Sequence, residues 1–316
     1  MKNFTSVHDV NSIPEMIREV LELKKNPYAF AELGKNKTLG LIFFNASLRT
    51  RLSTQKAALN LGMNVIVMNI GSEGWALEFT DGTVMNGETV EHIKDAASVM
   101  GLYCDIIGIR SFPTLKNKKE DDEEKVIQSF IQYAKVPIIS LESATLHPLQ
   151  SFADMVSIHE HKKTEHPNIV LAWAPHIKAL PQAVSNSFAE WSLHSGYNLT
   201  IAQPEGYELN EKFTQGATIA YDLGEAIENA DFIYVKNWSS YKKYGEILHN
   251  GEGWLLDEEM IKKTNQAKIM HCLPVRRNLE LKDELLDSEN SLIHHQAENR
   301  LYSAQAVLKK ILEFNF

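Results

Sequence analysis

The chain has 316 residues, enough for two domains of about 150 residues, and its hydrophobic content of 44% is ordinary for a packed globular protein. Its 32 Lys and Arg against 41 Asp and Glu give a formal net charge of −9, which argues against nucleic acid as a partner. Two cysteines, no signal-peptide core and no run near the ~20 apolar residues of a membrane span predict a cytoplasmic protein without a disulfide framework. The histidines show no metal-ligand spacing, so we expect neither a metal nor a cofactor.

The first half of the chain alternates helical and strand-like segments. Ser12-Ile-Pro-Glu15 is a capping-box start for a helix that runs to about Lys25. Four apolar segments predict strands at residues 39–44, 64–70, 105–110 and 137–141. The segments between them predict helices at residues 50–61, 89–100 and 121–134. This alternation is typical of a parallel sheet with crossover helices. The charged run at residues 116–125 predicts a solvated loop and helix start.

The second half repeats the pattern, with a boundary near residues 146–150. Its predicted strands are residues 169–174, 199–202, 217–221, 232–236 and 269–273. Residues 299–316 place apolar side chains on one stripe of a final helix. The expected fold is therefore α/β, with two doubly wound parallel-sheet domains.

An anion site is predicted where the first strand ends. The apolar run Leu41-Ile-Phe-Phe44 leads into Asn-Ala-Ser-Leu-Arg-Thr-Arg, and Ser47 sits where a helix would begin. A helix N-terminus offers unpaired backbone N–H groups, and the planar forks of Arg49 and Arg51 suit phosphate oxygens. Solvated arginines at an ordinary helix end are the alternative.

Two further motifs follow apolar runs: His147-Pro-Leu-Gln-Ser-Phe-Ala-Asp154 and His271-Cys-Leu-Pro-Val-Arg-Arg-Asn278. With Ser47-Leu-Arg-Thr-Arg51 they resemble, in order and separation, the motifs of the aspartate/ornithine carbamoyltransferase family. The resemblance covers nearly the whole chain. It implies a carbamoyl-phosphate-binding domain at residues 1–146, an acceptor-binding domain at 147–295 and a terminal helix at 296–316 that crosses back onto the first domain.

The resemblance also implies where the site lies and how the chain assembles. Ligands of open α/β sheets collect at the carboxyl ends of strands, where the candidate residues of both halves lie, so we expect a site in a cleft between the domains. We further expect a homotrimer in which Trp75 reaches the neighbouring subunit's site. A Trp75 packed on its own domain is the alternative.

The expected reaction is attack of a neutral amine on carbamoyl phosphate. Thr50, Arg110 and His147 are expected to polarise the carbonyl, with Cys272 beside the substrate rather than acting as a nucleophile. The residues expected to bind carbamoyl phosphate are Ser47, Leu48, Arg49, Thr50, Trp75, Arg110, His147, Gln150, Cys272, Leu273 and Arg300. Gln150 and the backbone near Leu273 would orient the carbamoyl NH2, which only donates hydrogen bonds.

The acceptor is expected to be an N-acylated ornithine. Ornithine carbamoyltransferases carry Asp-x-x-x-Ser-Met-Gly, whereas the matching region here reads Lys236-Asn-Trp-Ser-Ser-Tyr-Lys-Lys-Tyr-Gly245. Leu48 also replaces the threonine usual in the first motif. The residues expected to bind the acceptor are Val90, Glu142, His176, Lys236 and Arg276.

The prediction of which acyl group the acceptor carries depends on Val90. An acetyl-preferring member of this branch has Glu at the position that we align with Val90, and a succinyl-preferring member has Pro. Because Val90 carries no charge to repel a succinyl carboxylate, N-succinylornithine is favoured over N-acetylornithine, with the product used in arginine biosynthesis. An alignment shifted to Glu91 would reverse this inference.

Two other classes of function are weighed against this one. A dinucleotide-dependent dehydrogenase needs a glycine-rich turn after a strand, and neither Asn45–Arg51 nor Pro175–Pro181 contains a glycine. A non-catalytic carbamoyl-phosphate-binding regulatory relative would lack at least one of Arg49, Arg110, His147 or Cys272, and all four are present.

Overall fold

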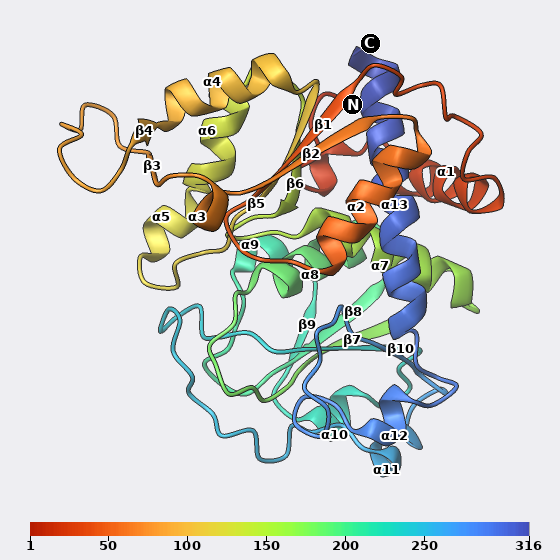
Figure 1. The fold of residues 1–316 in the computed structure, drawn as a ribbon. Coiled ribbons are helices and arrows are strands. Elements are labelled where there is room, and N and C mark those ends of the chain that lie inside the picture. Colours follow the sequence, from red (N-terminus) through yellow and green to blue (C-terminus); the bar gives the residue numbers. More distant parts are fainter. Residues whose placement is uncertain (316) are drawn as a thin grey trace. The chain divides into compact units, whose positions relative to one another are not determined.

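Residues 1–315 are described by the computed structural model, and the chain divides into two units (Figure 1). Unit 1 comprises Met1–Leu149 and the chain from Arg300 onward, and unit 2 comprises Gln150–Asn299. Helices α7 (Pro148–His161) and α13 (Ile293–Asn315) contain the two points where the division falls.

Unit 1 is built on a four-stranded sheet. Its strands are β1 (Thr38–Phe43), β2 (Asn64–Asn69), β5 (Ile106–Arg110) and β6 (Ile138–Glu142), in the order β2-β1-β5-β6. All neighbours run parallel. The interior strand β5 is buried throughout, as expected for a strand covered on both faces, whereas edge strand β2 is only partly buried.

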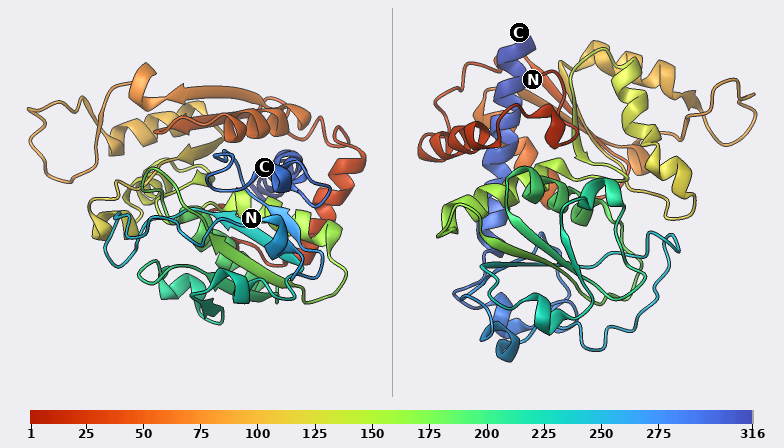
Figure 2. Two further views of the ribbon diagram at one scale, coloured as in Figure 1. Left: turned by 90° about the horizontal axis from the view of Figure 1, so that it is seen from below. Right: turned by 180° about the vertical axis from the view of Figure 1, so that it is seen from behind.

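The strand order decides which face each helix covers. Helix α2 (Arg49–Asn60) leads from β1 outward to β2, whereas α4 (Ile93–Tyr103) and α6 (Lys125–Tyr133) lead in the opposite direction across the sheet. Because βαβ crossovers are right-handed, opposite directions place the helices on opposite faces. Figure 1 and the view from behind in Figure 2 show α4 and α6 packed together on one side of the sheet, away from α2.

The last part of α13 belongs to unit 1 and packs beside α1 (Ile13–Lys25) and α2. Asn60 Nδ2 donates to Gln305 Oε1 at 2.9 Å, and Lys309 Nζ lies 2.7 Å from Glu19 Oε1. These contacts agree with the expected return of the terminal helix, although α13 begins earlier than predicted, at Ile293. Residue 316, the last of the predicted helix, lies outside the described residues.

Unit 2 contains a five-stranded parallel sheet in the order β11-β10-β7-β8-β9. The strands are β7 (Asn168–Trp173), β8 (Asn198–Ala202), β9 (Thr218–Ala220), β10 (Phe232–Lys236) and β11 (Lys268–Met270). Helix α8 (Ala183–His194) is buried over most of its length. All nine strands predicted in the two halves are therefore present, within two or three residues of their expected bounds.

The remaining elements are short. They are η1 (Val7–Asp9), α3 (Ile70–Glu73), β3 (Leu77–Glu78), β4 (Glu91–His92), α5 (Lys118–Asp122), α9 (Glu211–Thr214), α10 (Leu223–Ala226), α11 (Glu258–Ile261) and α12 (Asp283–Leu286). Strands β3 and β4 pair with each other in a small sheet of their own, from which a loop projects at the left of Figure 1.

Two predicted helices were wrong in their bounds. The helix expected at residues 121–134 is split into α5 and α6 by Glu124, which adopts a left-handed φ of 53°. The Glu124 carboxylate accepts hydrogen bonds from the turn that follows β6, including one from the Thr145 N–H at 2.7 Å. The helix expected from residue 89 begins at Ile93, because His92 caps it by accepting from the Lys94 N–H.

Candidate functional site

The predicted anion site lies at the start of α2. Helix α2 begins at Arg49, one residue before the predicted start, and Leu48 rather than Ser47 occupies its N-cap position. Leu48 has no side chain that can accept a hydrogen bond, and α2 has no side-chain cap. The first backbone N–H groups of α2 therefore keep the character of an anion-binding helix end.

Five predicted site residues of unit 1 lie together at the carboxyl end of its sheet. Arg110 Nη1 lies 3.4 Å from Thr50 Oγ1, and Arg300 Nη2 lies 2.9 Å from the same hydroxyl. Arg110 Nη1 also lies 2.5 Å from Glu142 Oε2, which is 3.5 Å from His147 Nε2. We call Thr50, Arg110, Glu142, His147 and Arg300 the arginine cluster.

The arginine cluster is buried, and its charges fix the state of the imidazole. His147 is 4% exposed. Burial, and then the positive charges of Arg300, Arg110 and Arg49, lower the pKa of His147 well below its ordinary value. His147 is therefore a neutral imidazole near pH 7, able to donate one hydrogen bond and accept another.

Two buried polar atoms of the arginine cluster are exceptional. Within residues 1–315, neither Arg110 Nε nor His147 Nδ1 has a hydrogen-bond partner. Most buried polar groups of folded proteins are hydrogen-bonded, so such atoms require an explanation. Their position among functional candidates makes recognition of a polar ligand the simplest one.

In unit 2, the segment His271–Arg276 follows β11 and is held by its own polar groups. The Leu273 N–H donates to His271 Nδ1 at 2.9 Å, and the His271 N–H donates to Gln296 Oε1 at 2.9 Å. The Leu273–Pro274 peptide bond is cis, and Leu273 has a left-handed φ of 55°. Because Nδ1 accepts a hydrogen bond, the proton of a neutral His271 lies on Nε2.

The acceptor-binding candidates of unit 2 surround Glu280. The Arg276 N–H donates to Glu280 Oε2 at 2.7 Å, and Arg276 Nε lies 3.2 Å from His176 Nε2. Burial raises the pKa of Glu280, but His271 and the positive charge of Lys236 outweigh it and hold that pKa below its ordinary value. Glu280 thus accepts from the Arg276 backbone and is stabilised as an anion by the charge of Lys236, although no sequence motif pointed to it.

Trp75 and Val90 lie just before the short strands β3 and β4, respectively. Trp75 is 55% exposed, and its Nε1 donates to Glu91 Oε2 at 2.8 Å. Val90 is 64% exposed. Successive residues of an extended segment point to opposite faces, so the side chains of Val90 and Glu91 face different surroundings.

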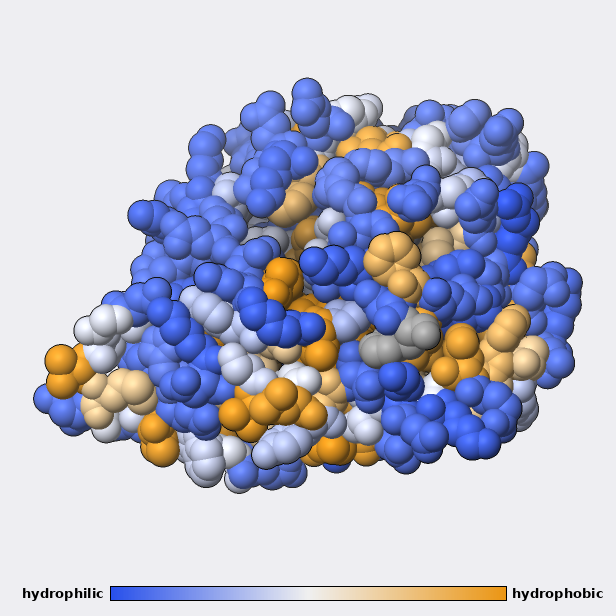
Figure 3. Space-filling view, turned by 90° about the horizontal axis from the view of Figure 1, so that it is seen from above, coloured by the Kyte–Doolittle hydropathy of each residue, from blue (hydrophilic) through white to orange (hydrophobic). Residues whose placement is uncertain are grey.

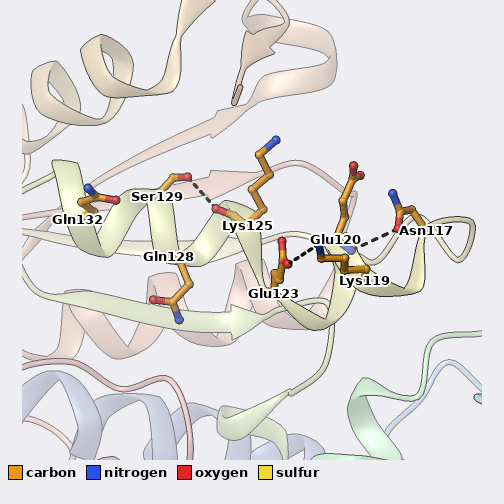
Figure 4. A pocket seen from close by; sticks show the side chains of 8 residues that line it. All are labelled: Asn117, Lys119, Glu120, Glu123, Lys125, Gln128, Ser129 and Gln132. Atoms are coloured by element: carbon orange, nitrogen blue, oxygen red, sulfur yellow. Dashed lines mark hydrogen bonds and ion pairs between the residues drawn. The ribbon is translucent and has the colours of Figure 1, made fainter. Parts of the chain in front are cut away.

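A separate hollow of about 570 Å³ lies over α5 and α6 (Figure 4). Its side chains come from the charged run predicted as solvated, and their bonds are local: Ser129 Oγ donates to the Lys125 carbonyl, and Lys119 pairs loosely with Glu123. No feature of this hollow marks it as a site.

Metal and membrane features were also sought within residues 1–315. No group of three or more His, Cys, Asp or Glu side chains there is arranged to hold a metal ion. No helix there is long and apolar enough to cross a membrane.

Comparison with known proteins identifies two family domains in the chain. Residues 2–160 match the carbamoyl-P binding domain of aspartate/ornithine carbamoyltransferases, and residues 181–311 match their Asp/Orn binding domain. The chain is 51% identical to N-succinylornithine carbamoyltransferase of Bacteroides fragilis (strain 638R), over 99% of both chains. It is 33% identical to N-acetylornithine carbamoyltransferase of Xanthomonas campestris pv. campestris, over 99% of this chain and 98% of the other.

Solved structures agree with the fold. Acetylornithine transcarbamylase complexed with acetylcitrulline matches with a TM-score of 0.92 and 32% identity, over 98% of this chain and 99% of the other. A variant of N-acetyl-L-ornithine transcarbamylase with one glutamate replaced by valine, complexed with carbamyl phosphate and N-succinyl-L-norvaline, also has a TM-score of 0.92 and 32% identity, over 98% and 100% of the two chains.

Proposed function

The chain belongs to the aspartate/ornithine carbamoyltransferase family, and on that premise we propose that it transfers the carbamoyl group of carbamoyl phosphate to the δ-amine of N-succinyl-L-ornithine. The products are N-succinyl-L-citrulline and phosphate, in arginine biosynthesis. The observation that carries the proposal is the arginine cluster beside the uncapped start of α2, in a chain 51% identical to an N-succinylornithine carbamoyltransferase.

Carbamoyl phosphate is assigned first to unit 1. The backbone N–H groups of Leu48, Arg49 and Thr50, the Ser47 hydroxyl, and the Arg49 and Arg300 side chains bind its phosphate. The carbonyl oxygen is assigned to Thr50, Arg110 and His147, whose neutral imidazole donates without adding a charge.

The other contacts to carbamoyl phosphate are assigned to Gln150, Cys272 and Leu273, with Trp75 from a neighbouring subunit. The carbamoyl NH2 is a pure donor, which Gln150 and the backbone near Leu273 accept from.

The bond changes follow from this binding. The neutral δ-nitrogen bonds to the carbamoyl carbon, the bond from that carbon to the phosphate oxygen breaks, and the nitrogen loses one proton. Negative charge grows on the carbonyl oxygen and on the leaving phosphate, where the arginines stabilise it. Holding both reactants in line contributes up to about 7–11 kcal/mol in model reactions.

The acylornithine is assigned to Glu142, His176, Lys236, Arg276 and Val90. Lys236 and Arg276 supply positive charge for its carboxylates. An α-amide is neutral, so a carboxylate partner for an α-ammonium is not needed.

The succinyl group is preferred over acetyl for two reasons. The two Bacteroides relatives, 51% and 49% identical, are N-succinylornithine carbamoyltransferases, whereas the N-acetylornithine relatives from Xanthomonas and Xylella are 33–36% identical. In addition, variants of an acetyl enzyme in which one glutamate is replaced by Ala, Val, Pro or Ser are complexed with N-succinyl-L-norvaline, and the residue that we align with that glutamate is the uncharged Val90.

A homotrimer completes the proposal. Unit 1 exposes apolar side chains on α2, on edge strand β2 and on the β3–β4 segment, among them Leu52, Ile66, Trp75 and Val84. Figure 3 shows orange side chains gathered at the projecting left end and along the neighbouring rim. Exposed apolar groups of this kind are typical of subunit contacts. We assign Trp75 to the site of a neighbouring subunit.

The test is a direct assay of the protein with carbamoyl phosphate and ornithine, N-acetylornithine or N-succinylornithine, with each citrulline product quantified. We expect N-succinylcitrulline to form with a kcat/KM at least about tenfold above that for the acetyl compound, a preference of ~1.4 kcal/mol. Faster formation of N-acetylcitrulline would establish the acetyl alternative. No product from any amine would favour the non-catalytic regulatory relative.

A further inference from the structure

Asp154 ends the His147–Asp154 motif, yet no role proposed above uses it. It lies four residues after Gln150 on α7, so the two side chains share one face of the helix. Its side chain is fully buried in unit 2. A carboxylate that is kept in a protein interior is normally tied to specific donors.

Two glutamine side chains donate to the same oxygen of Asp154. Gln150 Nε2 and Gln296 Nε2 each lie 2.8 Å from Oδ1. A carboxylate only accepts hydrogen bonds, so both amides must present their NH2 groups to it, which settles the orientation of each. Gln296 then directs its oxygen to the His271 N–H, at 2.9 Å. Asp154 thus sets both the Gln150 amide and the support of the His271–Arg276 segment.

The orientation of Gln150 matters because of its proposed ligand. With its nitrogen on Asp154, the amide directs its oxygen to the other side. An oxygen is what the carbamoyl NH2 requires, since that group has only hydrogens to offer. If the Gln150 amide were reversed, its NH2 group would face the carbamoyl NH2 group, and neither could accept a hydrogen bond from the other.

Tyr234 is a further buried polar residue near Asp154. Its hydroxyl is buried near Asp154 and Cys272, and burial, followed by the proximity of these two residues, raises the pKa of Tyr234 well above its ordinary value. Tyr234 therefore stays a phenol, which can donate to either neighbour.

We infer that Asp154 is a positioning residue that fixes the amide of Gln150, and through it the carbamoyl group, in the reaction proposed above. The inference rests on that proposed function. It adds a residue that touches no reactant and acts only through Gln150.

A double-mutant cycle tests this inference. We expect Asp154→Ala to lower kcat/KM for carbamoyl phosphate at least about tenfold in the wild-type background, while lowering it less than about twofold when Gln150 is already alanine. The KM for the acylornithine should change little. Asn299→Ala is the matched control. Like Asp154, Asn299 is buried, and from α13 its Nδ2 donates to Ser157 Oγ and Glu160 Oε2, which lie on α7 about two helical turns or more beyond Gln150. This variant should lower the free energy of unfolding without the kinetic loss.

Equal losses from Asp154→Ala in both backgrounds, or a loss matched by Asn299→Ala, would show that Asp154 only supports the fold. If Asp154→Ala does not fold, the cycle is run with Asp154→Asn, which keeps an acceptor oxygen. Full activity, or a loss that vanishes with Gln150→Ala, supports the inference, and a loss unchanged by Gln150→Ala overturns it. Absence of any product from the wild-type protein would instead refute the proposed function itself.

Discussion

At the scale of single residues, the proposed role of Val90 is to discriminate between two acceptors that differ by one carboxymethyl group. Placing a carboxylate at position 90 about 4 Å from a succinyl group costs about 4 kcal/mol at an effective dielectric near 20, before water and side-chain movement reduce it. We expect Val90→Glu to lower kcat/KM for N-succinylornithine at least about tenfold relative to N-acetylornithine. Steady-state kinetics with both acceptors measure this ratio.

The matched control for this prediction is Val84→Glu, which adds the same charge to another exposed valine of the same loop. It should leave the ratio within about twofold of wild type. If Val90→Glu also leaves the ratio unchanged, Val90 does not line the acyl pocket, and the assignment of succinyl loses its residue-level support.

His147 makes stability depend on pH in a definite direction. Its pKa is lower in the folded protein than in the unfolded chain, so as pH falls below about 6.5 the unfolded chain takes up the proton first. His147 therefore lowers the free energy of unfolding progressively below that pH, by at most ~1.4 kcal/mol per pH unit, and has no such effect above pH 7.

The measurement is urea unfolding from pH 7.5 to 5.5. The wild type should lose stability relative to His147→Gln over this interval, whereas His8→Gln, at an exposed histidine, should follow the wild type. A constant difference between wild type and His147→Gln across the interval would mean that His147 is not held neutral by the fold.

The sequence predicted the residues of the arginine cluster but not how they pair. Short motifs and strand ends were enough to identify Thr50, Arg110 and His147, because the ends of parallel strands meet at one edge of a sheet. Asp154 was missed because its contact with Gln296 spans a long stretch of chain. Glu280 was missed because it lies outside the three motifs, although its contact with Arg276 is local. For Asp154 a signal existed: its spacing of four from Gln150 on a predicted helix.

At the scale of elements, the packing of α4 against α6 depends on Gly101. A Cβ built on Gly101 would lie 1.9 Å from the Ala134 carbonyl oxygen, which is backbone and cannot turn away. Alanine is intrinsically favoured over glycine in a helix by about 1 kcal/mol, but overpacking of this kind costs about 1–3 kcal/mol. We expect Gly101→Ala to lower the free energy of unfolding in spite of its better helix propensity.

Gly71→Ala provides the comparison, because a Cβ there would meet nothing within 4 Å. Chemical denaturation of both variants should show a loss for Gly101→Ala and little change for Gly71→Ala. Equal midpoints would mean that α4 and α6 move apart at no measurable cost.

Strand prediction succeeded and helix boundaries failed for identifiable reasons. Most strands of the two sheets are apolar runs that are buried along most of their length, and such runs stand out in the sequence. The break between α5 and α6 arises from Glu124, whose carboxylate satisfies the turn at residues 143–145. No local pattern reveals a partner twenty residues away.

At the scale of the whole molecule, the proposed trimer can be tested by complementation. Trp75→Ala subunits keep a complete arginine cluster, and Arg110→Ala subunits keep Trp75. If Trp75 acts in a neighbouring site, mixed trimers of the two inactive variants should regain activity, up to roughly a third of wild type or less because only some sites combine both intact residues. Activity is measured after dissociation and reassociation of the mixed subunits.

Mixing Arg110→Ala with His147→Ala is the control, since both residues belong to one cluster within a single chain. No site of such a hybrid is complete, so activity should stay absent. Hybrids of the first pair that form but remain inactive would place the action of Trp75 within its own chain.

Unit 1 is made of two segments that lie far apart in the sequence, and this determines the order in which the molecule can fold during synthesis. Thr50 meets Arg300 and Asn60 meets Gln305, contacts that span 250 and 245 residues of chain. A ribosome adding about 5–20 residues per second makes all of unit 2 between the two parts of unit 1. For at least several seconds, therefore, the first 149 residues are outside the ribosome while the part of α13 that packs on α1 and α2 has not yet been made. During that interval the apolar face of α1 has no C-terminal helix to pack against, and the arginine cluster is completed only after Arg300 emerges.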